Sequence, residues 1–555
     1  MSLPRFHWRA LCFLLALSLS ACARADGFLP QLNLDLRETT VSGISSGAFM
    51  AVQLAVAHSA NIKGVASTAG GPYFCAGEAS WNGAAVGKAI ARCMQGDPAF
   101  GVAPITSEDM AIMQNATESW AGRGLIDPLD DLARQKVWIF HGYNDGIVKT
   151  PVSDALRAYY RAFLQNEGQI FYKHELPAAH AQISASCAAD AGQCNACAET
   201  GGNFINTCVV GKTAYDAAAS ALQFFHGPLQ RTASRHLKGE ILSFNQAYYT
   251  MLGEEDEIDP IRISMAATGY LYVPPACKNG EPCRLHIAFH GCQQGAENIG
   301  MAFVKGAGFN EWAEKNNIVI LYPQAASVSL VLAGTGLLPL NPNGCWDWWG
   351  YNDTGDKKAG HYATQQGAQV AAVWRMAQAL ASSAERIDDA DAATDAPVPA
   401  ETDATPSGEA VEKSPPPAKL KRAPQLKVVD VSSDQVMLLW SAVPNARRYA
   451  LYRVEAPKRG AAHTAKAPGE DTAQLLYTVE DADIPFASFV DHGLQEKTAY
   501  HYRLVASGAA ENDERASAIL SVTTAAQEPA CDPYFSMLSG KPVTQDGTPA
   551  TAVCP

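Results

Sequence analysis

The sequence predicts an α/β domain followed by a linker and an all-β sandwich. Residues 26–385 mix short β-rich runs with helical patterns, as α/β proteins do. Residues 386–423 are rich in Ala, Pro, Thr, Lys and acidic residues and lack a periodic apolar pattern, so they cannot build a core. Residues 424–526 contain several short strands separated by turns, which is typical of a β-sandwich. Because such a linker separates the domains, we expect few contacts between them.

Length, composition and charge narrow the class of protein. The chain has 555 residues, too many for one compact core, and its hydrophobic fraction of 47% and charged fraction of 18% are ordinary for a soluble globular enzyme. The net charge of −14 argues against a surface that binds a polyanion, because phosphate contacts need a basic patch. We therefore expect no nucleic-acid partner.

Residues 1–25 have the features of an export signal. Two arginines precede an apolar run over residues 10–20 that ends in small residues, and this run is too short to span a membrane. The run ends in a lipobox-like sequence that would make Cys22 the lipidated first residue, whereas residues 21–23 also suit an ordinary signal peptidase. We expect an exported protein, extracellular, periplasmic or on the cell surface, with a membrane contact only through this possible lipid anchor.

The cysteines favour disulfides. Of 14 cysteines, Cys12 and Cys22 belong to the signal, which leaves an even number in local groups. In an exported protein such groups indicate disulfides. A zinc site built from the CxxC of Cys194 and Cys197 is the alternative, with Cys187 and Cys208 as the second pair. The export signal favours disulfides and no metal. The groups are Cys75 and Cys93; Cys187, Cys194, Cys197 and Cys208; Cys277 and Cys283; Cys292 and Cys345; Cys531 and Cys554.

A Gly-Ile-Ser-Ser-Gly pentapeptide at residues 43–47 predicts a nucleophilic serine at Ser45. It follows a β-branched run at residues 37–41 and opens into an apolar helical pattern at residues 48–56. Strand, sharp turn and helix in this order form a nucleophile elbow. The helix N-terminus also places a positive dipole end where negative charge develops during ester attack.

The base and the orienting carboxylate of a triad follow in the order Ser, Asp, His. An apolar strand at residues 136–140 runs into a Gly/Asn loop that carries Asp145, which we predict to be the orienting acid. A second strand, at residues 169–176, leads to His180 in a loop of small residues, and we predict His180 to be the general base. His174 lies within that strand and is expected to be structural.

The strands that usually precede the nucleophile come later in this chain. Too few residues lie before Ser45 to hold them, whereas an apolar strand at residues 285–289 ends in a His-Gly loop and another follows at residues 318–323. The domain therefore resembles a circularly permuted α/β-hydrolase, which is feasible because domain termini often lie close together. We expect the backbone N–H groups of Ser46 and Cys292 to form the oxyanion hole.

Several motifs in this order resemble the poly(3-hydroxybutyrate) depolymerases with a permuted α/β-hydrolase domain. The motifs are residues 45–51, 69–73, 290–292 and 343–350. The resemblance implies a triad of Ser45, Asp145 and His180, oxyanion donors at positions 46 and 292, and a Trp near position 346 lining the polymer crevice. Pairing of Cys292 with Cys345 would tie the oxyanion loop to that aromatic segment. A polyester is the implied partner, and no cofactor is needed.

Three tryptophans at positions 346, 348 and 349 bear on substrate binding. They cannot all point into one core, so we expect at least one to be exposed, with Trp346 and Trp348 as substrate-binding residues. Fold alone does not fix the substrate, so a feruloyl or acetyl esterase of this fold remains an alternative, as does a surface protein that only binds polymer.

The C-terminal sandwich resembles a fibronectin type III module, with Trp440 on an early strand and a tyrosine-corner pattern before Tyr502. Such a module carries no catalytic residues, so it would act as a spacer or hold an insoluble substrate. Residues 527–555 would form a short tail closed by Cys531 and Cys554.

Overall fold

The computed structural model describes most of the chain outside its N-terminus, the linker and the C-terminal tail. The export signal with Cys22, most of the linker and the Cys531–Cys554 pair lie outside the described residues. None of the helices in the described ranges is long and apolar enough to cross a membrane. These ranges are residues 27–77, 87, 89–96, 104–186, 194–250, 258–329, 333–334, 338–353, 360–381, 419–454, 473–480, 486–509, 513–527, 534–535 and 542–543.

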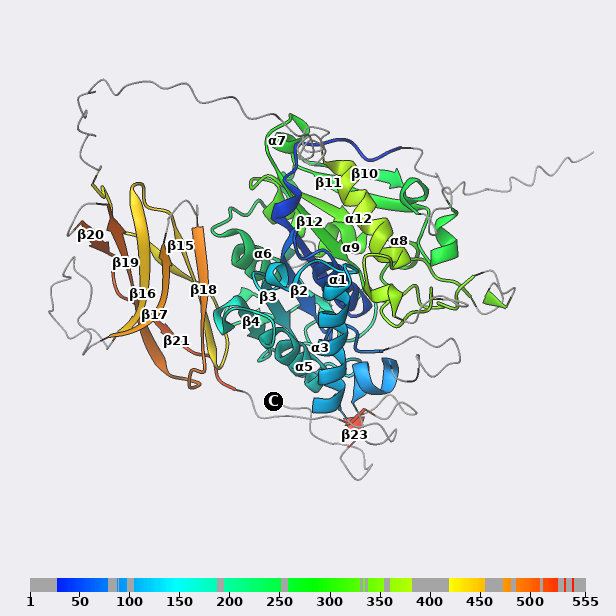
Figure 1. Ribbon diagram of the computed structural model, residues 1–555, viewed down its shortest axis with the longest axis horizontal. Coiled ribbons are helices and arrows are strands. Elements are labelled where there is room, and N and C mark those ends of the chain that lie inside the picture. The colour runs from blue at the N-terminus through cyan, green and yellow to red at the C-terminus, as the bar shows by residue number, and fades with distance from the viewer. Residues whose placement is uncertain are drawn as a thin grey trace, which may run out of the picture.

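An eight-stranded mixed sheet forms the centre of the first domain (Figure 1). Only β11 runs antiparallel to its neighbours; every other pair in this sheet is parallel. This arrangement confirms the predicted α/β-hydrolase fold. In sheet order the strands are β10 (Glu240–Asn245), β11 (Thr268–Val273), β13 (Ile318–Tyr322), β12 (Arg284–Phe289), β1 (Thr39–Ile44), β2 (Ile62–Thr68), β3 (Lys136–Phe140) and β4 (Ile170–Lys173).

Helices cover both faces of this sheet because alternate side chains of its strands are apolar on both sides. In β3, Val137 and Ile139 join the core beneath one helical layer, and Trp138 and Phe140 join the core on the other face. The first layer contains α1 (Ser46–Ala57), α3 (Ser107–Gly122), α5 (Thr150–Arg161) and α12 (Ala368–Leu380), and the second contains α6 (Ala217–His226), α9 (Ala302–Gly306) and α10 (Phe309–Ala313). Shorter elements are α4 (Leu129–Leu132), α7 (Pro275–Lys278), α8 (Ala296–Ile299), β5 (Gln182–Ile183), β6 (Asn195–Ala196), β7 (Ile205–Thr207), β8 (Val209–Val210) and β9 (Thr213–Ala214).

The two ends of the hydrolase domain lie side by side, which confirms the predicted permutation. The Leu32 N–H donates to the Leu380 carbonyl at 2.7 Å, and Leu34 forms a bridge with Cys283 just before β12. In the sheet, β1 pairs with β2 on one side and with β12 on the other. Strands from opposite ends of the domain sequence therefore meet at its centre.

The C-terminal domain is a fibronectin type III-like sandwich. Trp440 is buried in its core, and the Tyr500 hydroxyl accepts the Gln495 N–H at 2.8 Å, which is the hydrogen bond of a tyrosine corner. One sheet contains β14 (Leu426–Val431), β15 (Gln435–Ser441) and β18 (Phe486–His492). The other contains β17 (Ala473–Glu480), β16 (Ala446–Val454), β19 (Ala499–Gly508), β20 (Glu514–Ala516) and β21 (Leu520–Thr523); a separate pair, β22 (Tyr534–Phe535) and β23 (Pro542–Val543), follows.

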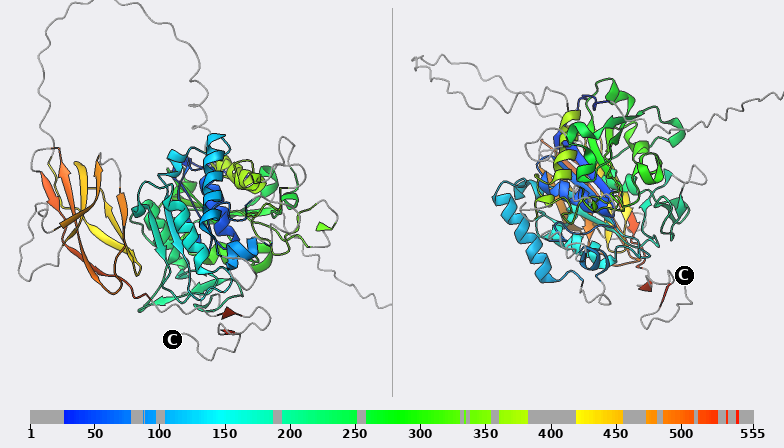
Figure 2. Two further views of the ribbon diagram at one scale, coloured as in Figure 1. Left: turned by 60° about the horizontal axis from the view of Figure 1, so that its bottom comes forward. Right: turned by 90° about the vertical axis from the view of Figure 1, so that its right-hand side faces the viewer.

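The expectation of few contacts between the domains is wrong. The sheet of β14, β15 and β18 packs against β4 and α6 of the hydrolase domain (Figures 1 and 2). Met437 and Val490 are fully buried in one apolar cluster with Phe171 and Phe224. Linker composition does not determine docking; the unbroken apolar run along β15, at residues 436–440, is the feature that indicates a strand buried on both faces.

Disulfides occur where the cysteine groups predict them. The bonded pairs in the described residues include Cys75–Cys93, Cys197–Cys208, Cys277–Cys283 and Cys292–Cys345. The zinc alternative is wrong, because Cys197 and Cys208 are bonded to each other and cannot act as thiolate ligands.

A buried histidine joins the two central strands. His286 of β12 is within hydrogen-bond distance of the Thr40 hydroxyl through Nδ1 and of the Ser42 hydroxyl through Nε2, both at 2.8 Å. Burial lowers the pKa of His286 to about 3. In the unfolded chain the same imidazole titrates near 6.5. Below that pH the unfolded state therefore binds a proton that the folded state does not.

This difference predicts acid destabilisation. The contribution of His286 to the free energy of unfolding is complete above about pH 6.5. It is lost as the pH falls toward 3, at about 1.4 kcal/mol per pH unit. Thermal or urea unfolding between pH 7 and pH 4 should show this slope. The variant His286→Asn should be less stable at pH 7, with a slope shallower by about that amount. Identical slopes in the two proteins would contradict the neutral, buried state of His286.

Candidate active site

Ser45 occupies a strained turn between β1 and α1. Its φ of 55° and ψ of −126° lie outside the regions that most residues adopt. A Cβ on Gly43 would lie 2.1 Å from the Gly47 carbonyl oxygen, and one on Gly47 would lie 2.3 Å from the His290 carbonyl oxygen. Both glycines are therefore required by close backbone packing. The result is the predicted elbow, with Ser45 at its apex.

Asp145 and His180 form a hydrogen-bonded pair. His180 Nδ1 lies 2.7 Å from Asp145 Oδ2, and Asp145 Oδ1 accepts the N–H groups of Ile147 and Val148 at 2.8 and 3.0 Å. Burial on its own would raise the pKa of Asp145, but His180 beside it and the backbone donors hold that pKa below its usual value. The ionised carboxylate fixes the proton of a neutral His180 on Nδ1, so Nε2 can accept a proton from a nucleophile.

The sheet brings the three predicted triad residues to one edge. Ser45 directly follows β1, Asp145 follows β3, and His180 follows β4. The carboxyl ends of parallel strands share one edge of a sheet, where α/β proteins build their sites. All three side chains are buried, which excludes most water from their surroundings.

The loop after β12 lies beside Ser45. A Cβ on Gly291 would lie 3.4 Å from Ser45 Cβ, and the Gly291 N–H donates to Gln294 Oε1 at 2.8 Å. The disulfide between Cys292 and Cys345 anchors the same loop. Neither the Ser46 nor the Cys292 N–H donates a hydrogen bond to another described residue. Both N–H groups are therefore available to an oxyanion, and their role as oxyanion donors stays a prediction.

His290 supports this loop, a role that the sequence analysis missed. Its Nε2 accepts the Ala325 N–H at 3.1 Å, so the proton lies on Nδ1, which donates to the Gly291 carbonyl at 2.7 Å. This neutral form persists because burial lowers the pKa of His290 to about 4. The His-Gly sequence at the end of a buried strand was the available signal.

Trp346 and Trp348 are buried and Trp349 is half-buried, so the three tryptophans form no exposed platform. The role of Trp346 and Trp348 in substrate binding stays a prediction. Trp346 has 0% of its surface exposed and donates from Nε1 to the His290 carbonyl at 3.0 Å. Trp348 is 4% exposed and stacks on Phe49, with ring centroids 4.1 Å apart. Both rings belong to one apolar core, in which Trp346 packs against Phe289 and Trp348 against Phe49. The more exposed apolar side chain beside the triad is that of Ile147, at 37%.

His174 does not join the triad. Together with Glu175 and Asp434 it forms a cluster at the domain boundary, and the potential ligand atoms of these three side chains lie within 4.8 Å of one another. Such a group could hold a metal ion. Lys173 Nζ already lies 3.4 Å from Glu175, and an Arg157 nitrogen lies 3.3 Å from Asp434, so the carboxylate charges are balanced without one. We call His174, Glu175 and Asp434 the boundary cluster.

Comparisons with known proteins agree with this geometry, although no family model matches the chain. The chain is 33% identical over 429 residues to a poly(3-hydroxybutyrate) depolymerase of Delftia acidovorans, a match that covers 77% of this chain and 71% of that protein. It is also 33% identical to a polyhydroxybutyrate depolymerase of Talaromyces funiculosus, over 64% of this chain and 93% of that protein.

A solved structure extends the agreement to the fold. A PHB depolymerase complexed with R3HB trimer is 29% identical with a TM-score of 0.50, and the match covers 64% of this chain and 98% of that one. The permuted sheet, the strained serine turn and these relatives lead to the same assignment. The chain belongs to the poly(3-hydroxybutyrate) depolymerase family.

Proposed function

We propose that the protein is an exported serine esterase that hydrolyses ester bonds of poly(3-hydroxybutyrate) or a related short-chain polyhydroxyalkanoate. The observation that carries the proposal is Ser45 in its strained turn, with the free N–H groups of Ser46 and Cys292 beside it. The hydrogen-bonded pair of Asp145 and His180 supplies the base. The two relatives named as depolymerases support the polyester substrate. A serine-to-alanine variant was used for the solved R3HB complex, which supports a serine nucleophile.

The proposed reaction has two halves. His180 Nε2 takes the proton of the Ser45 hydroxyl as Oγ attacks the ester carbonyl, and the N–H groups of Ser46 and Cys292 stabilise the oxyanion. The alcohol end of the cleaved chain leaves with the proton from His180. Water, deprotonated by His180, then attacks the acyl-enzyme and releases the acid end. Asp145 holds the imidazole orientation and stabilises its positive charge throughout.

Export is part of the proposal. Residues 1–25 have the pattern of a signal peptide, and the disulfides require an oxidising compartment to form and persist. Mass spectrometry of the mature N-terminus from a secreting host tests the cleavage. A start near residue 26 supports an ordinary signal peptidase, a diacylated Cys22 supports the lipid anchor, and an intact N-terminus in the cytoplasm would contradict export.

The nucleophile assignment predicts a large difference between two neighbouring serines. Ser45→Ala should lower turnover by about a million-fold, because it removes the attacking oxygen. Ser46→Ala should cost far less, because Ser46 contributes its backbone N–H. Turnover of a soluble short-chain ester by the two purified variants, with circular dichroism to check folding, measures this. Equal losses would contradict the assignment.

The oxyanion loop predicts a dependence on one disulfide. Replacing Cys292 and Cys345 together by Ser should reduce kcat about a hundred-fold. The reason is that an N–H donor displaced by about 1 Å no longer forms its hydrogen bond to the oxyanion in the transition state. The matched control replaces Cys277 and Cys283, whose disulfide lies at the opposite end of β12. That control should retain its kcat. Equal kcat values in the two double variants would show that the Cys292–Cys345 bond does not position the loop.

Substrate class is tested by comparing two esters. The fold alone does not fix the substrate, but the two relatives are named as depolymerases. The wild-type protein should therefore clear a poly(3-hydroxybutyrate) suspension and should turn over a soluble feruloyl ester poorly. Efficient feruloyl turnover without clearing would assign the same triad to another ester.

A further inference from the structure

The sandwich contacts the segment that carries the proposed catalytic base. We define the boundary turn as residues 432–434, between β14 and β15, and the His180 loop as residues 174–180, which directly follow β4. β4 is the last strand of the central sheet, so one side of it has no strand partner. An open edge of this kind needs cover. In this protein the sandwich provides it.

Gln435 binds the backbone of the edge strand directly. Its side-chain oxygen accepts the Tyr172 N–H at 2.7 Å, and its amide nitrogen lies 3.3 Å from the Ile170 carbonyl oxygen. One amide side chain therefore replaces part of the hydrogen bonding that a ninth strand would provide. This contact fixes the position of β4 just before the chain enters the His180 loop.

The boundary turn holds the beginning of the His180 loop. The Ser433 N–H donates to Glu175 Oε1 at 2.6 Å, and Lys173 Nζ donates to the Val431 carbonyl. Lys173 and Glu175 are only 4% and 7% exposed. A buried charged pair that loses its partners destabilises the fold strongly. These contacts therefore make docking of the sandwich a strong restraint on the loop.

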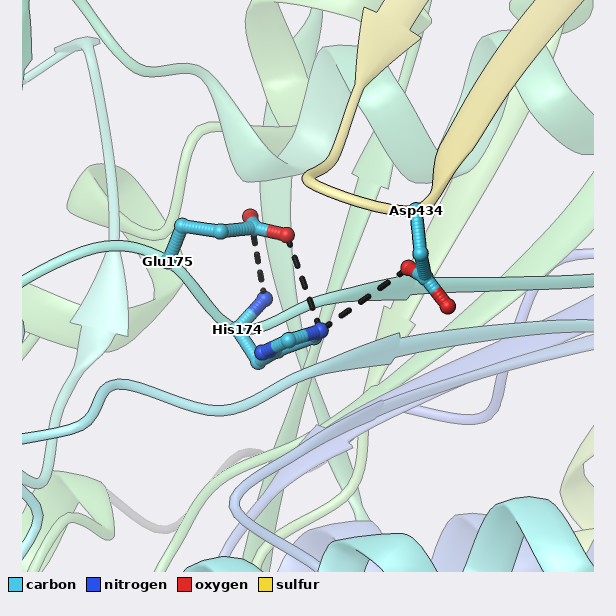
Figure 3. Close-up of side chains that lie close together, drawn as sticks. All are labelled: His174, Glu175 and Asp434. Atoms are coloured by element: carbon cyan, nitrogen blue, oxygen red, sulfur yellow. Dashed lines mark hydrogen bonds and ion pairs between the residues drawn. The ribbon is translucent and has the colours of Figure 1, made fainter. Parts of the chain in front are cut away.

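The boundary cluster adds charge pairing to this restraint. His174 Nε2 lies 3.6 Å from Glu175 Oε1 and 3.9 Å from Asp434 Oδ1, and Figure 3 shows the imidazole between the two carboxylates, which come from opposite sides of the boundary. Arg157 of α5 also faces Asp434. The Arg157 guanidinium of the hydrolase domain thus pairs with a carboxylate of the sandwich.

The other side of the His180 loop is bound to the segment that carries Asp145. The Tyr143 N–H donates to the Leu176 carbonyl at 3.1 Å, and the Asn144 N–H donates to the Ala178 carbonyl at 3.2 Å. The loop is therefore fixed between the boundary turn and the Asp145 segment. A shift on the sandwich side would be transmitted to the hydrogen bond between His180 and Asp145.

We propose that the sandwich is a positioning element of the active site: through Gln435 and the Ser433–Glu175 contact it sets the place of His180 against Asp145. This role differs from tethering a polymer, and it rests on the proposed function of His180 as the base. Lys173 and Glu175 are buried by the contact with the sandwich, so the hydrolase domain depends on that contact to cover these two charges.

The experiment uses full-length variants on a soluble short-chain ester, so that polymer binding plays no part. Glu175→Ala and, independently, Gln435→Ala should lower kcat at least about ten-fold with little change in KM, because the base is displaced while the ester pocket remains. Glu175→Gln should recover much of the loss, since its amide oxygen can still accept the Ser433 N–H. The matched control is Ser488→Ala, which removes two boundary hydrogen bonds outside the His180 loop. The Ser488 hydroxyl donates to the Phe224 carbonyl and accepts from Lys136 Nζ, and this variant should keep its kcat.

A split between kcat and KM separates positioning from general destabilisation. In Glu175→Ala and Gln435→Ala proteins that circular dichroism shows to be folded, the loss should fall on kcat while KM stays near the wild-type value, and Ser488→Ala should show neither change. Wild-type kcat in both variants, while Ser45→Ala is inactive, would overturn the positioning role alone. Activity in Ser45→Ala and His180→Ala would instead overturn the proposed function.

A chelator distinguishes direct contacts from a metal-mediated one. The wild-type rate should be unchanged after exhaustive treatment with EDTA, because the charges of the boundary cluster are balanced by Lys173 and Arg157. Loss of activity that zinc restores, and that Asp434→Ala abolishes, would overturn direct positioning in favour of a metal at the boundary.

Discussion

The close approach of α1 to the ends of β1 and β12 is the constraint on which the site depends. No side chain fits at Gly43 or Gly47, because backbone oxygen atoms occupy the space that a Cβ would need. This contact forces Ser45 into its unusual conformation and aligns the start of α1 with the loop after β12. The proposed nucleophile and both proposed oxyanion donors are thereby set by backbone packing, which changes little during a reaction. Such preorganisation is the main source of transition-state stabilisation in acyl transfer.

Permutation has a physical consequence for this arrangement. β1 and β12 are neighbours in the sheet, yet the chain reaches β12 only after completing β2, β3 and β4. Parallel strands joined by long connections pair late, because the loop-closure entropy must be overcome first. The hydrogen bond between Leu32 and Leu380 restrains the second half against the first. Within the second half, the Cys292–Cys345 disulfide and the hydrogen bond from the Gln293 N–H to the Asn343 carbonyl hold the loop after β12.

Local patterns predicted the elements whose function is encoded within a few residues. The elbow around Ser45 and the loops carrying Asp145 and His180 follow from strand, turn and helix signals, and the structure brings Asp145 and His180 within hydrogen-bond distance. The late strand that supplies Cys292 was also predicted. The burial of Trp346 was not predicted. Its Nε1 donates to the carbonyl of His290, which is distant in the sequence, so no local pattern indicates this contact.

The docking of the sandwich shows a second limit of the sequence. Linker composition describes the connection between domains but carries no information on the surfaces that they present. The partners at the boundary, such as Gln435 with the backbone of β4, are pairs of polar groups far apart in the chain. The unbroken apolar run of β15 was the one local sign of a strand covered on both faces. The spatial contacts, and with them the support for the His180 loop, follow only from the assembled fold.

The most direct test of the account is to identify the residue that becomes covalently modified in the active enzyme. A fluorophosphonate that mimics the tetrahedral intermediate should inactivate the protein with one equivalent bound, and peptide mass spectrometry should locate the adduct on Ser45. The oligomeric R3HB ester, added in excess, should slow this labelling. An adduct on another residue, or full inactivation without an adduct on Ser45, would contradict the serine mechanism and the site described above.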